Sequence, residues 1–268
     1  MSPQDLPSDA APLQITSRAN ALLVALRKGL RDGAAYRRSG LVWLEGEHLC
    51  AAAVARGVAV RQVLLSAGGW QRPARRDLAR AAAARIALLP DALFAELGTL
   101  ESPADIGFVI DAPAAAEPDA ALPSVVLDRL QDAGNVGSIL RSAAALGVRQ
   151  ALALKGTAAL WSPKVLRAGM GAHFALRLVE GLGEDELLAL RLPLVGTSSH
   201  DGQALPQAAL PQPAAWLLGH EGQGVSARLA AACVARVRIP QPGGEESLNV
   251  AAAAAVCFYE SLRRGPAA

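Results

Sequence analysis

The sequence is poor in aromatic residues, cysteine and lysine. Aromatic side chains make up only 4% of the 268 residues, so any hydrophobic core must be built mainly from Ala, Val and Leu. The three cysteines, Cys50, Cys233 and Cys257, are far apart and form no C-x-x-C pair. This spacing excludes a disulfide framework and a zinc site of the usual kind, and free thiols are typical of a reducing cytosol.

No segment has the composition of a membrane anchor or a targeting signal. The apolar run at 251–258 is far shorter than the about 20 residues that a membrane helix needs. The N-terminal segment MSPQDLPSDAAP is polar and proline-rich, without the charged-then-apolar layout of a secretion signal. Neither H-E-x-x-H nor a cluster of acidic residues is present. We therefore expect a cytoplasmic protein that contacts no membrane and holds no metal.

Positive charge is concentrated in one part of a nearly neutral chain. The net charge is only +2, yet residues 18–85 hold 13 Lys and Arg against four Asp and Glu, and residues 91–119 hold seven acids and no Lys or Arg. Such a basic region is typical of a protein with a polyanionic partner such as nucleic acid. An ordinary solvated surface rich in arginine is the alternative interpretation.

Helix and strand patterns alternate in two blocks. In the first block we expect helices at 18–31, 51–56 and 74–84, and strands at 41–45, 61–65 and 85–89. Thr16 and Ser17 are candidate N-caps of the first helix. In the second block we expect strands at 125–127, 150–154, 192–197, 216–218 and 237–239, and helices at 136–146, 163–170 and 248–262.

This alternation predicts an α/β protein with largely parallel sheets. A Pro/Ala-rich stretch without apolar periodicity separates the two blocks and is the best linker candidate. The predicted organisation is a disordered tail at 1–14, a smaller α/β domain at 15–112, a linker at 113–123 and a second α/β domain at 124–268.

The first motif is Asp132-Ala-Gly-Asn-Val-Gly-Ser-Ile-Leu-Arg141, which follows a buried strand and opens a helix. Asn135 can cap that helix, and Arg141 is expected beside the carboxyl end of the strand, where open α/β sheets bind ligands. A surface arginine on an amphipathic helix is the alternative, although the apolar flanks make free solvation less favourable.

The second motif is Gly219-His-Glu-Gly-Gln-Gly224, directly after the apolar strand that contains Leu218. Its G-x-x-G-x-G spacing differs from the G-x-G-x-x-G of dinucleotide folds, so a nicotinamide or flavin oxidoreductase is disfavoured. The third motif, Ile239-Pro-Gln-Pro-Gly-Gly-Glu-Glu-Ser-Leu-Asn-Val250, runs from a strand through a loop into a helix that Ser247 can cap. Alone, each of the two is consistent with a simple turn or helix start.

Taken in order, the three motifs resemble those of the SpoU/TrmH branch of the SPOUT methyltransferases, over about 125–263. The segment from Ile15 to Leu49 resembles the substrate-binding domain that precedes the catalytic domain in many ribosomal-RNA members. The resemblance implies a parallel sheet with a deep trefoil knot, a homodimer, and transfer of a methyl group from S-adenosylmethionine to a ribose 2'-hydroxyl.

The resemblance also assigns roles to individual residues. Those that match the family's active-site positions are Asn135, Arg141, Glu221, Ser247 and Asn249. Those expected to contact the cofactor are Thr197, Leu218, Gly219, Gly224, Ile239, Ser247 and Leu248. Those expected to bind RNA are Arg18, Arg37, Arg38 and Arg141. Gln241 departs from the family, which commonly has Met after the proline; we expect it to line the loop.

Several points stay open at this stage. Arg141 is often described as the base in this family, but a guanidinium has no free acceptor and suits charge stabilisation or phosphate binding better. Glu221 is expected either to orient the site or to anchor its loop. A general-base role for His173 or His220 is disfavoured. The expected substrate is 23S ribosomal RNA at a guanosine, with transfer RNA or a non-catalytic RNA-binding role as alternatives.

Overall fold

The structure is a computed structural model that describes residues 11–98, 104–199, 201–243 and 247–265. The chain forms two compact units. Unit 1 comprises residues 1–113 with 161–174, and unit 2 comprises 114–160 with 175–268. The first break lies at the start of the predicted linker. The segment 161–174 groups with unit 1, whereas the sequence analysis places it in the second domain.

The structure describes only part of the predicted disordered tail at 1–14. Residues 1–10 lie outside the described residues, whereas Leu13–Gln14 form strand β1, which pairs with Ala87 and Leu88. Thus the last residues of the expected disordered tail are part of a sheet. The first helix also begins later than predicted: α1 spans Ala21–Arg31 and is capped by Asn20, not Thr16 or Ser17, because Asn20 Oδ1 accepts from Leu22 N at 3.0 Å.

Unit 1 is built on a five-stranded sheet of order β1-β4-β3-β5-β2. Its strands after β1 are β2 (Leu41–Glu45), β3 (Gln62–Ser66), β4 (Arg85–Leu89) and β5 (Ile106–Asp111). Its other helices are α2 (Tyr36–Ser39), α3 (Glu47–Ala55), α4 (Ala67–Trp70), α5 (Pro73–Ala81), α6 (Asp91–Ala95), α8 (Pro163–Gly169) and the 3-10 turn η1 (Ala172–Ala175). The sheet is mixed rather than largely parallel, because β5, which the sequence analysis missed, pairs antiparallel with both β2 and β3.

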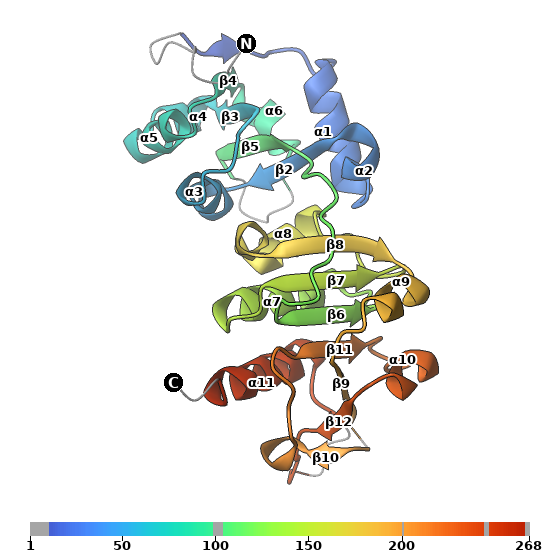
Figure 1. Cartoon of the computed structure of the whole chain (residues 1–268). Coiled ribbons are helices and arrows are strands. Elements are labelled where there is room, and N and C mark those ends of the chain that lie inside the picture. The colour runs from blue at the N-terminus through green and yellow to red at the C-terminus, as the bar shows by residue number, and fades with distance from the viewer. Residues whose placement is uncertain (1–10, 99–103, 200, 244–246, 266–268) are drawn as a thin grey trace. The chain divides into compact units, whose positions relative to one another are not determined.

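Unit 2 contains a seven-stranded sheet of order β10-β12-β9-β11-β6-β7-β8, and every pairing among its described strands is parallel (Figure 1). The strands are β6 (Ser124–Asp128), β7 (Gln150–Leu154), β8 (Arg177–Leu182), β9 (Leu194–Thr197), β10 (Gln203–Ala204), β11 (Ala215–Gly219) and β12 (Ala235–Arg238). The helices are α7 (Ala133–Ala145), α9 (Glu184–Ala189), the 3-10 turn η2 (Leu205–Gln207), α10 (Ala227–Ala231) and α11 (Val250–Arg263). The parallel α/β fold predicted for this part is confirmed.

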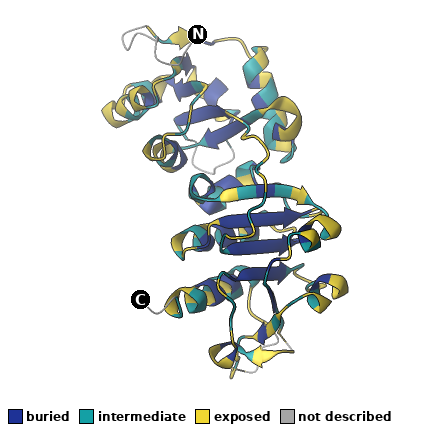
Figure 2. Ribbon diagram, viewed as in Figure 1, coloured by how far each residue is buried: buried dark blue, intermediate teal, exposed yellow. Residues whose placement is uncertain are grey.

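The central strands of unit 2 are buried on both faces (Figure 2). On one face, Leu217 packs in a cluster with Leu187 of α9 and Leu229 of α10. Its neighbour Trp216 points the other way, since successive strand residues alternate, and donates from Nε1 to Ser261 Oγ of α11 at 2.9 Å. Both faces are therefore covered, as parallel sheets require.

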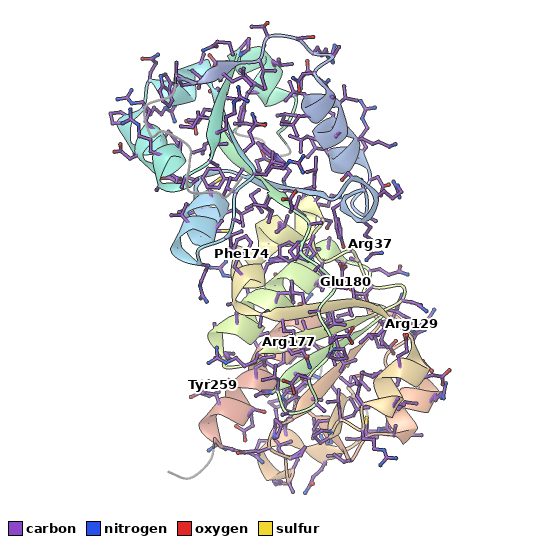
Figure 3. All side chains as sticks on the ribbon, turned by 45° about the horizontal axis from the view of Figure 1, so that its top comes forward. Arg37, Arg129, Phe174, Arg177, Glu180 and Tyr259 are labelled. Carbon is purple, nitrogen blue, oxygen red and sulfur yellow. The ribbon has the colours of Figure 1, made fainter. Side chains whose placement is uncertain are left out.

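The strand β8 was not predicted from the sequence. It is the edge strand of unit 2, and its burial pattern is mostly intermediate or exposed. Glu180, labelled in Figure 3, lies on this strand and accepts from Leu160 N at 2.8 Å.

None of the described helices is long and apolar enough to cross a bilayer. The trefoil knot stays a prediction.

Candidate active site

A cavity of about 300 Å³ lies at the carboxyl edge of the unit 2 sheet. The chain runs from β6 to β7 and β8 on one side and then returns to β9, β11 and β12 on the other. Open α/β sheets bind ligands where the strand order reverses in this way. The residues that line the cavity come from the ends of β9, β11 and β12 and from the starts of α7 and α11. They are Asn135, Thr197, Ser198, Ser199, Gly219, His220, Glu221, Gly224, Val225, Val237, Ile239, Gln241, Ser247, Leu248, Asn249, Val250, Ala253 and Cys257.

Most of the residues that the sequence analysis assigned to this site line the cavity. These are Asn135, Thr197, Gly219, Glu221, Gly224, Ile239, Ser247, Leu248 and Asn249. Two assigned residues do not: Leu218 is fully buried within β11, and Arg141 is exposed on α7. Residues 244–246, which include Glu245 and Glu246 of the third motif, lie outside the described residues.

The glycine-rich turn 219–224 is closed tightly on itself. A Cβ on Gly219 would lie 2.2 Å from both the carbonyl carbon of Gly224 and the nitrogen of Val225, so no side chain fits there. Gly224 N donates to His220 O at 2.8 Å, and Gly224 has a φ of +68°, which favours glycine. Gly219 and Gly224 are therefore required by the turn itself.

The side chain of His220 also stabilises this turn. Its Nδ1 accepts hydrogen bonds from Gly222 N at 3.0 Å and from Gln223 N at 3.2 Å. A nitrogen that already accepts two backbone donors has no lone pair left for a substrate proton. Cys257, deeper in the cavity, is equally unsuited to proton transfer, because burial raises the pKa of its thiol to about 12.

Glu221 links the glycine-rich turn to the loop after β6. Its carboxylate accepts from Gln131 N at 3.3 Å, from Asp132 N at 3.2 Å and from Asn135 Nδ2 at 3.3 Å. Burial acts to raise the pKa of Glu221, but the hydrogen bonds from its own backbone N–H, Gln131, Asn135 and Asp132 outweigh burial and lower the pKa below its ordinary value. An ionised carboxylate of lowered pKa is a weak base, so the geometry favours anchoring over proton transfer.

Asn135 extends this link to the third motif. Its Oδ1 accepts from Asn249 Nδ2 at 2.9 Å, while its Nδ2 donates to Glu221. Three loops that are far apart in the sequence are thus joined through a chain of two side-chain hydrogen bonds. We refer to Glu221, Asn135 and Asn249 as the polar bridge.

The helix caps at this site differ from those predicted. Asp132, not Asn135, caps α7, with its Oδ1 accepting from Asn135 N at 2.7 Å. Asn249, not Ser247, caps α11, with its Oδ1 accepting from Ala251 N at 2.9 Å. Because the amide of Asn249 has an acceptor and a donor, it caps the helix and holds Asn135 at the same time.

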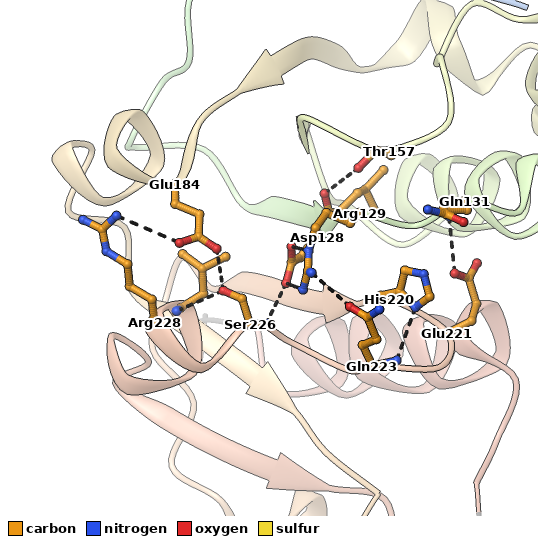
Figure 4. A network of polar contacts seen from close by, with 12 residues as sticks. Asp128, Arg129, Gln131, Thr157, Glu184, His220, Glu221, Gln223, Ser226 and Arg228 are labelled. Atoms are coloured by element: carbon orange, nitrogen blue, oxygen red, sulfur yellow. Dashed lines mark hydrogen bonds and ion pairs between the residues drawn. The ribbon is translucent and has the colours of Figure 1, made fainter.

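A second network, which the sequence analysis missed, holds the far end of the glycine-rich turn (Figure 4). Asp128, fully buried at the end of β6, accepts from Ser226 N at 2.8 Å and from Arg129 Nε at 2.7 Å. Arg129 Nη1 also donates to Gln223 Oε1 at 3.2 Å. One feature of the sequence could have indicated this network, namely the pair Asp128-Arg129 directly after the apolar residues of β6. The turn is therefore fixed at both ends, by the polar bridge and by Asp128.

Of the residues expected to bind RNA, Arg18, Arg37 and Arg38 lie in unit 1, whereas Arg141 lies on α7 of unit 2. Arg18 donates to Glu96 Oε2 at 3.0 Å, and Arg38 forms an ion pair with Asp32. The guanidinium of Arg37 lies over the ring of Tyr36, 5.6 Å from its centroid. A shallow groove beside α1 is lined by Arg18, Ala19, Val24, Arg27, Lys28 and Arg31.

Comparison with known proteins agrees with this arrangement. The model of the SpoU rRNA Methylase family matches residues 123–259. An uncharacterized tRNA/rRNA methyltransferase of Synechocystis is 33% identical over 97% of this chain and 96% of its own length. The 23S rRNA (uridine(2479)-2'-O)-methyltransferase of Streptomyces viridochromogenes is 31% identical over 95% of this chain and 93% of its own length. The crystal structure of the SpoU methyltransferase AviRb from that organism, in complex with AdoMet, superposes with a TM-score of 0.84 at 28% identity, covering 91% of this chain and 98% of AviRb.

The anchoring role of Glu221 predicts a pH-dependent loss of stability in Glu221→Gln. The folded-state pKa of Glu221 is lowered from 4.5, so its ionised form stabilises the fold above that pH, and this contribution disappears as the pH falls through the folded-state pKa. We expect Glu221→Gln to lower the free energy of unfolding by about 1 kcal/mol at pH 7, after screening by solvent. Urea unfolding should show the difference from wild type shrinking below pH 4.5.

Glu117, which is exposed and lies outside the cavity lining, offers a matched control. Glu117→Gln should leave the free energy of unfolding unchanged across the same pH range. A Glu221→Gln variant as stable as wild type at pH 7 would show that the carboxylate does not anchor the turn.

Proposed function

Because the chain belongs to the SpoU rRNA methylase family, we propose that it transfers a methyl group from S-adenosylmethionine to a ribose 2'-hydroxyl of RNA, with 23S ribosomal RNA as the substrate. The observation that carries this proposal is the cavity at the carboxyl edge of the unit 2 sheet, where the polar bridge joins all three motifs. The named activities of full-length relatives and the AdoMet-bound neighbour support it.

The residues of the cavity fit S-adenosylmethionine. Its volume of about 300 Å³ lies at the lower end of the range of small-molecule sites. The lining combines apolar side chains such as Ile239 and Leu248 with hydroxyls and amides, and Gln241 Oε1 is buried without a hydrogen-bond partner among the described residues. Bound there, S-adenosylmethionine supplies an electrophilic methyl group on its sulfonium.

Arg141 is proposed to stabilise the charge that develops on the attacking 2'-oxygen, or to bind the adjacent phosphate. The guanidinium carries donors only, so it stabilises an alkoxide without accepting the proton. The carboxylate of Glu221 already accepts from the segment after β6, and His220 Nδ1 already accepts from within the turn. Their proposed contribution is to hold the loop backbone at the positions that the ligand contacts.

A homodimer would place Arg141 at a partner's cavity. Arg141 is exposed on α7 and does not line the cavity of its own chain. Beside it, α11 packs against α7 and exposes Val256, Tyr259 and Leu262, with exposed fractions of 41%, 57% and 53%; Tyr259 is labelled in Figure 3. Exposed apolar residues at helical spacing are typical of an interface. We therefore propose that α7 and α11 pair with a second copy.

The experiment that tests the activity is transfer of a labelled methyl group from S-adenosylmethionine to 23S ribosomal RNA lacking modifications. Digestion to nucleosides should give 2'-O-methyl nucleosides as the only labelled products. Mapping of the labelled nucleotide tests the preference for guanosine, which stays a prediction; the Streptomyces relative is named for a uridine. Transfer RNA in a parallel reaction tests the alternative substrate. Binding of RNA without incorporation would instead support a non-catalytic protein.

Arg141→Ala should separate binding from turnover. We expect cofactor affinity by calorimetry to stay within about twofold of wild type, while turnover falls by about 10²–10³. Sedimentation should show a dimer for both proteins, and Arg149→Ala, a change at an exposed arginine just beyond the same helix, should retain full turnover. Loss of cofactor binding by a folded Arg141→Ala dimer would refute the assigned role.

The basic groove beside α1 is proposed to bind RNA phosphates. Lys28 and Arg31 are exposed one turn apart, whereas Arg18 and Arg27 in the same groove share the carboxylate of Glu96. Phosphate contacts release counterions and make affinity salt-dependent. Filter binding across 50–200 mM salt should show that Lys28→Ala/Arg31→Ala weakens RNA binding and reduces the salt slope by about 1 to 2. Arg80→Ala/Arg85→Ala, on α5 and β4, should leave the slope unchanged; equal effects of the two pairs would refute a specific groove.

A further inference from the structure

Gln241 carries an unsatisfied polar atom at the wall of the cavity. It lies three residues beyond the end of β12, and its side chain lines the cavity. Its Oε1 is inaccessible to solvent and has no hydrogen-bond partner among the described residues. A buried acceptor without a donor costs free energy unless a ligand supplies the donor. The side chain is therefore prepared for a hydrogen bond that the described part of the chain does not itself make.

The sheet order places the strand that leads to Gln241 away from the strand that leads to Asn135. Between β12, which leads to Gln241, and β6, which leads to Asn135, lie β9 and β11. Three strand spacings amount to roughly 14 Å. The cavity therefore has a polar end beside Asn135 and Glu221 and an opposite end beside β12. At the β12 end, the lining includes the apolar side chains of Val237 and Ile239.

The chemistry at the β12 end matches a purine base better than the other parts of the cofactor. A base has flat apolar faces that pack on aliphatic side chains, and an edge with adjacent donor and acceptor groups. The ammonium, carboxylate and sulfonium groups are charged and are better accommodated near polar side chains and solvent. A glutamine amide matches an adenine edge with two parallel hydrogen bonds, as in the recognition of adenine in nucleic acids.

We infer that Gln241 recognises the adenine of S-adenosylmethionine through its edge. Oε1 accepts from the 6-amino group, and Nε2 donates to N7, on the edge where a 6-oxo base offers only acceptors. This inference rests on the proposed function, because it requires that the cavity bind this cofactor. It makes Gln241 a determinant of cofactor selectivity, separate from the residues that act at the transferred methyl group.

The test compares two ligands that differ at the base edge. Calorimetry measures the affinity for S-adenosylhomocysteine and for S-inosylhomocysteine, in which a 6-oxo group replaces the 6-amino group. Wild type should prefer the adenosine ligand, and Gln241→Met, which keeps the side-chain length but removes both hydrogen bonds, should reduce that preference by about fivefold to tenfold. Without ligand, Gln241→Met should melt no lower than wild type, because the change removes an unsatisfied buried acceptor.

Two further variants sharpen the comparison. Gln241→Glu retains an acceptor oxygen and should keep a preference for the 6-amino ligand. Gln241→Leu, which also removes both hydrogen bonds, serves in place of Gln241→Met if that variant does not fold. Gln207→Met, at an exposed glutamine outside the cavity lining, should match wild type with both ligands.

Each outcome bears on a different claim. An unchanged preference in folded Gln241→Met, or a wild type that binds the two ligands equally, overturns the role of Gln241 while the proposed function stands. A wild type that binds neither ligand overturns the proposed function and this inference with it.

Discussion

The site depends on the polar bridge of Glu221, Asn135 and Asn249. Each of these residues lies in the segment that follows a different strand, and the two hydrogen bonds between them, at 3.3 and 2.9 Å, join the three segments. Single hydrogen bonds at exposed positions contribute little stability individually. Their importance here is geometric, because they fix the relative positions of backbone groups that a ligand contacts.

The bridge also determines which groups remain for chemistry. Glu221 uses its carboxylate oxygens to hold two backbone amides and one side-chain amide, and His220 uses Nδ1 to hold two more backbone amides. The cavity is thus rich in fixed dipoles, and its acidic and imidazole groups are occupied in shaping the loop. This arrangement is consistent with catalysis by preorganised electrostatics, for which we propose Arg141, on an exposed helix face, as the charged group.

The sequence predicted the parallel α/β fold of unit 2 and most of the residues that line its cavity, but it did not predict every strand or helix cap. Strong apolar runs such as 150–154 and the glycine-rich turn were readable because burial and backbone conformation constrain them directly. The edge strand β8 was missed because a half-exposed strand lacks a clear apolar run. The antiparallel β5 was missed although its residues 106–110 form a buried, mostly apolar run. The caps were misassigned because several capping side chains compete within a few residues, and only the hydrogen-bond geometry decides between them.

The sequence also did not predict the contacts between residues that lie far apart along the chain. Nothing in the local pattern shows that Asp128 receives Ser226 N, or that Asn249 reaches Asn135, because each pair is separated by about a hundred residues. The order of the three motifs indicated that they act together, and the structure supplies the physical link. The same reasoning explains why Arg141 could be named from its motif but not placed in a cavity.

A double-mutant cycle on the bridge tests this account most directly. Asn135→Ala removes one partner, and Asn249→Ser keeps a capping oxygen for α11 while leaving no amide to reach Asn135. The affinity for S-adenosylhomocysteine, measured by calorimetry for wild type, both single variants and the double variant, gives the coupling energy. The account predicts a coupling of about 1 kcal/mol, with the double variant scarcely weaker than either single one. Additive losses would contradict a bridge that acts as one unit.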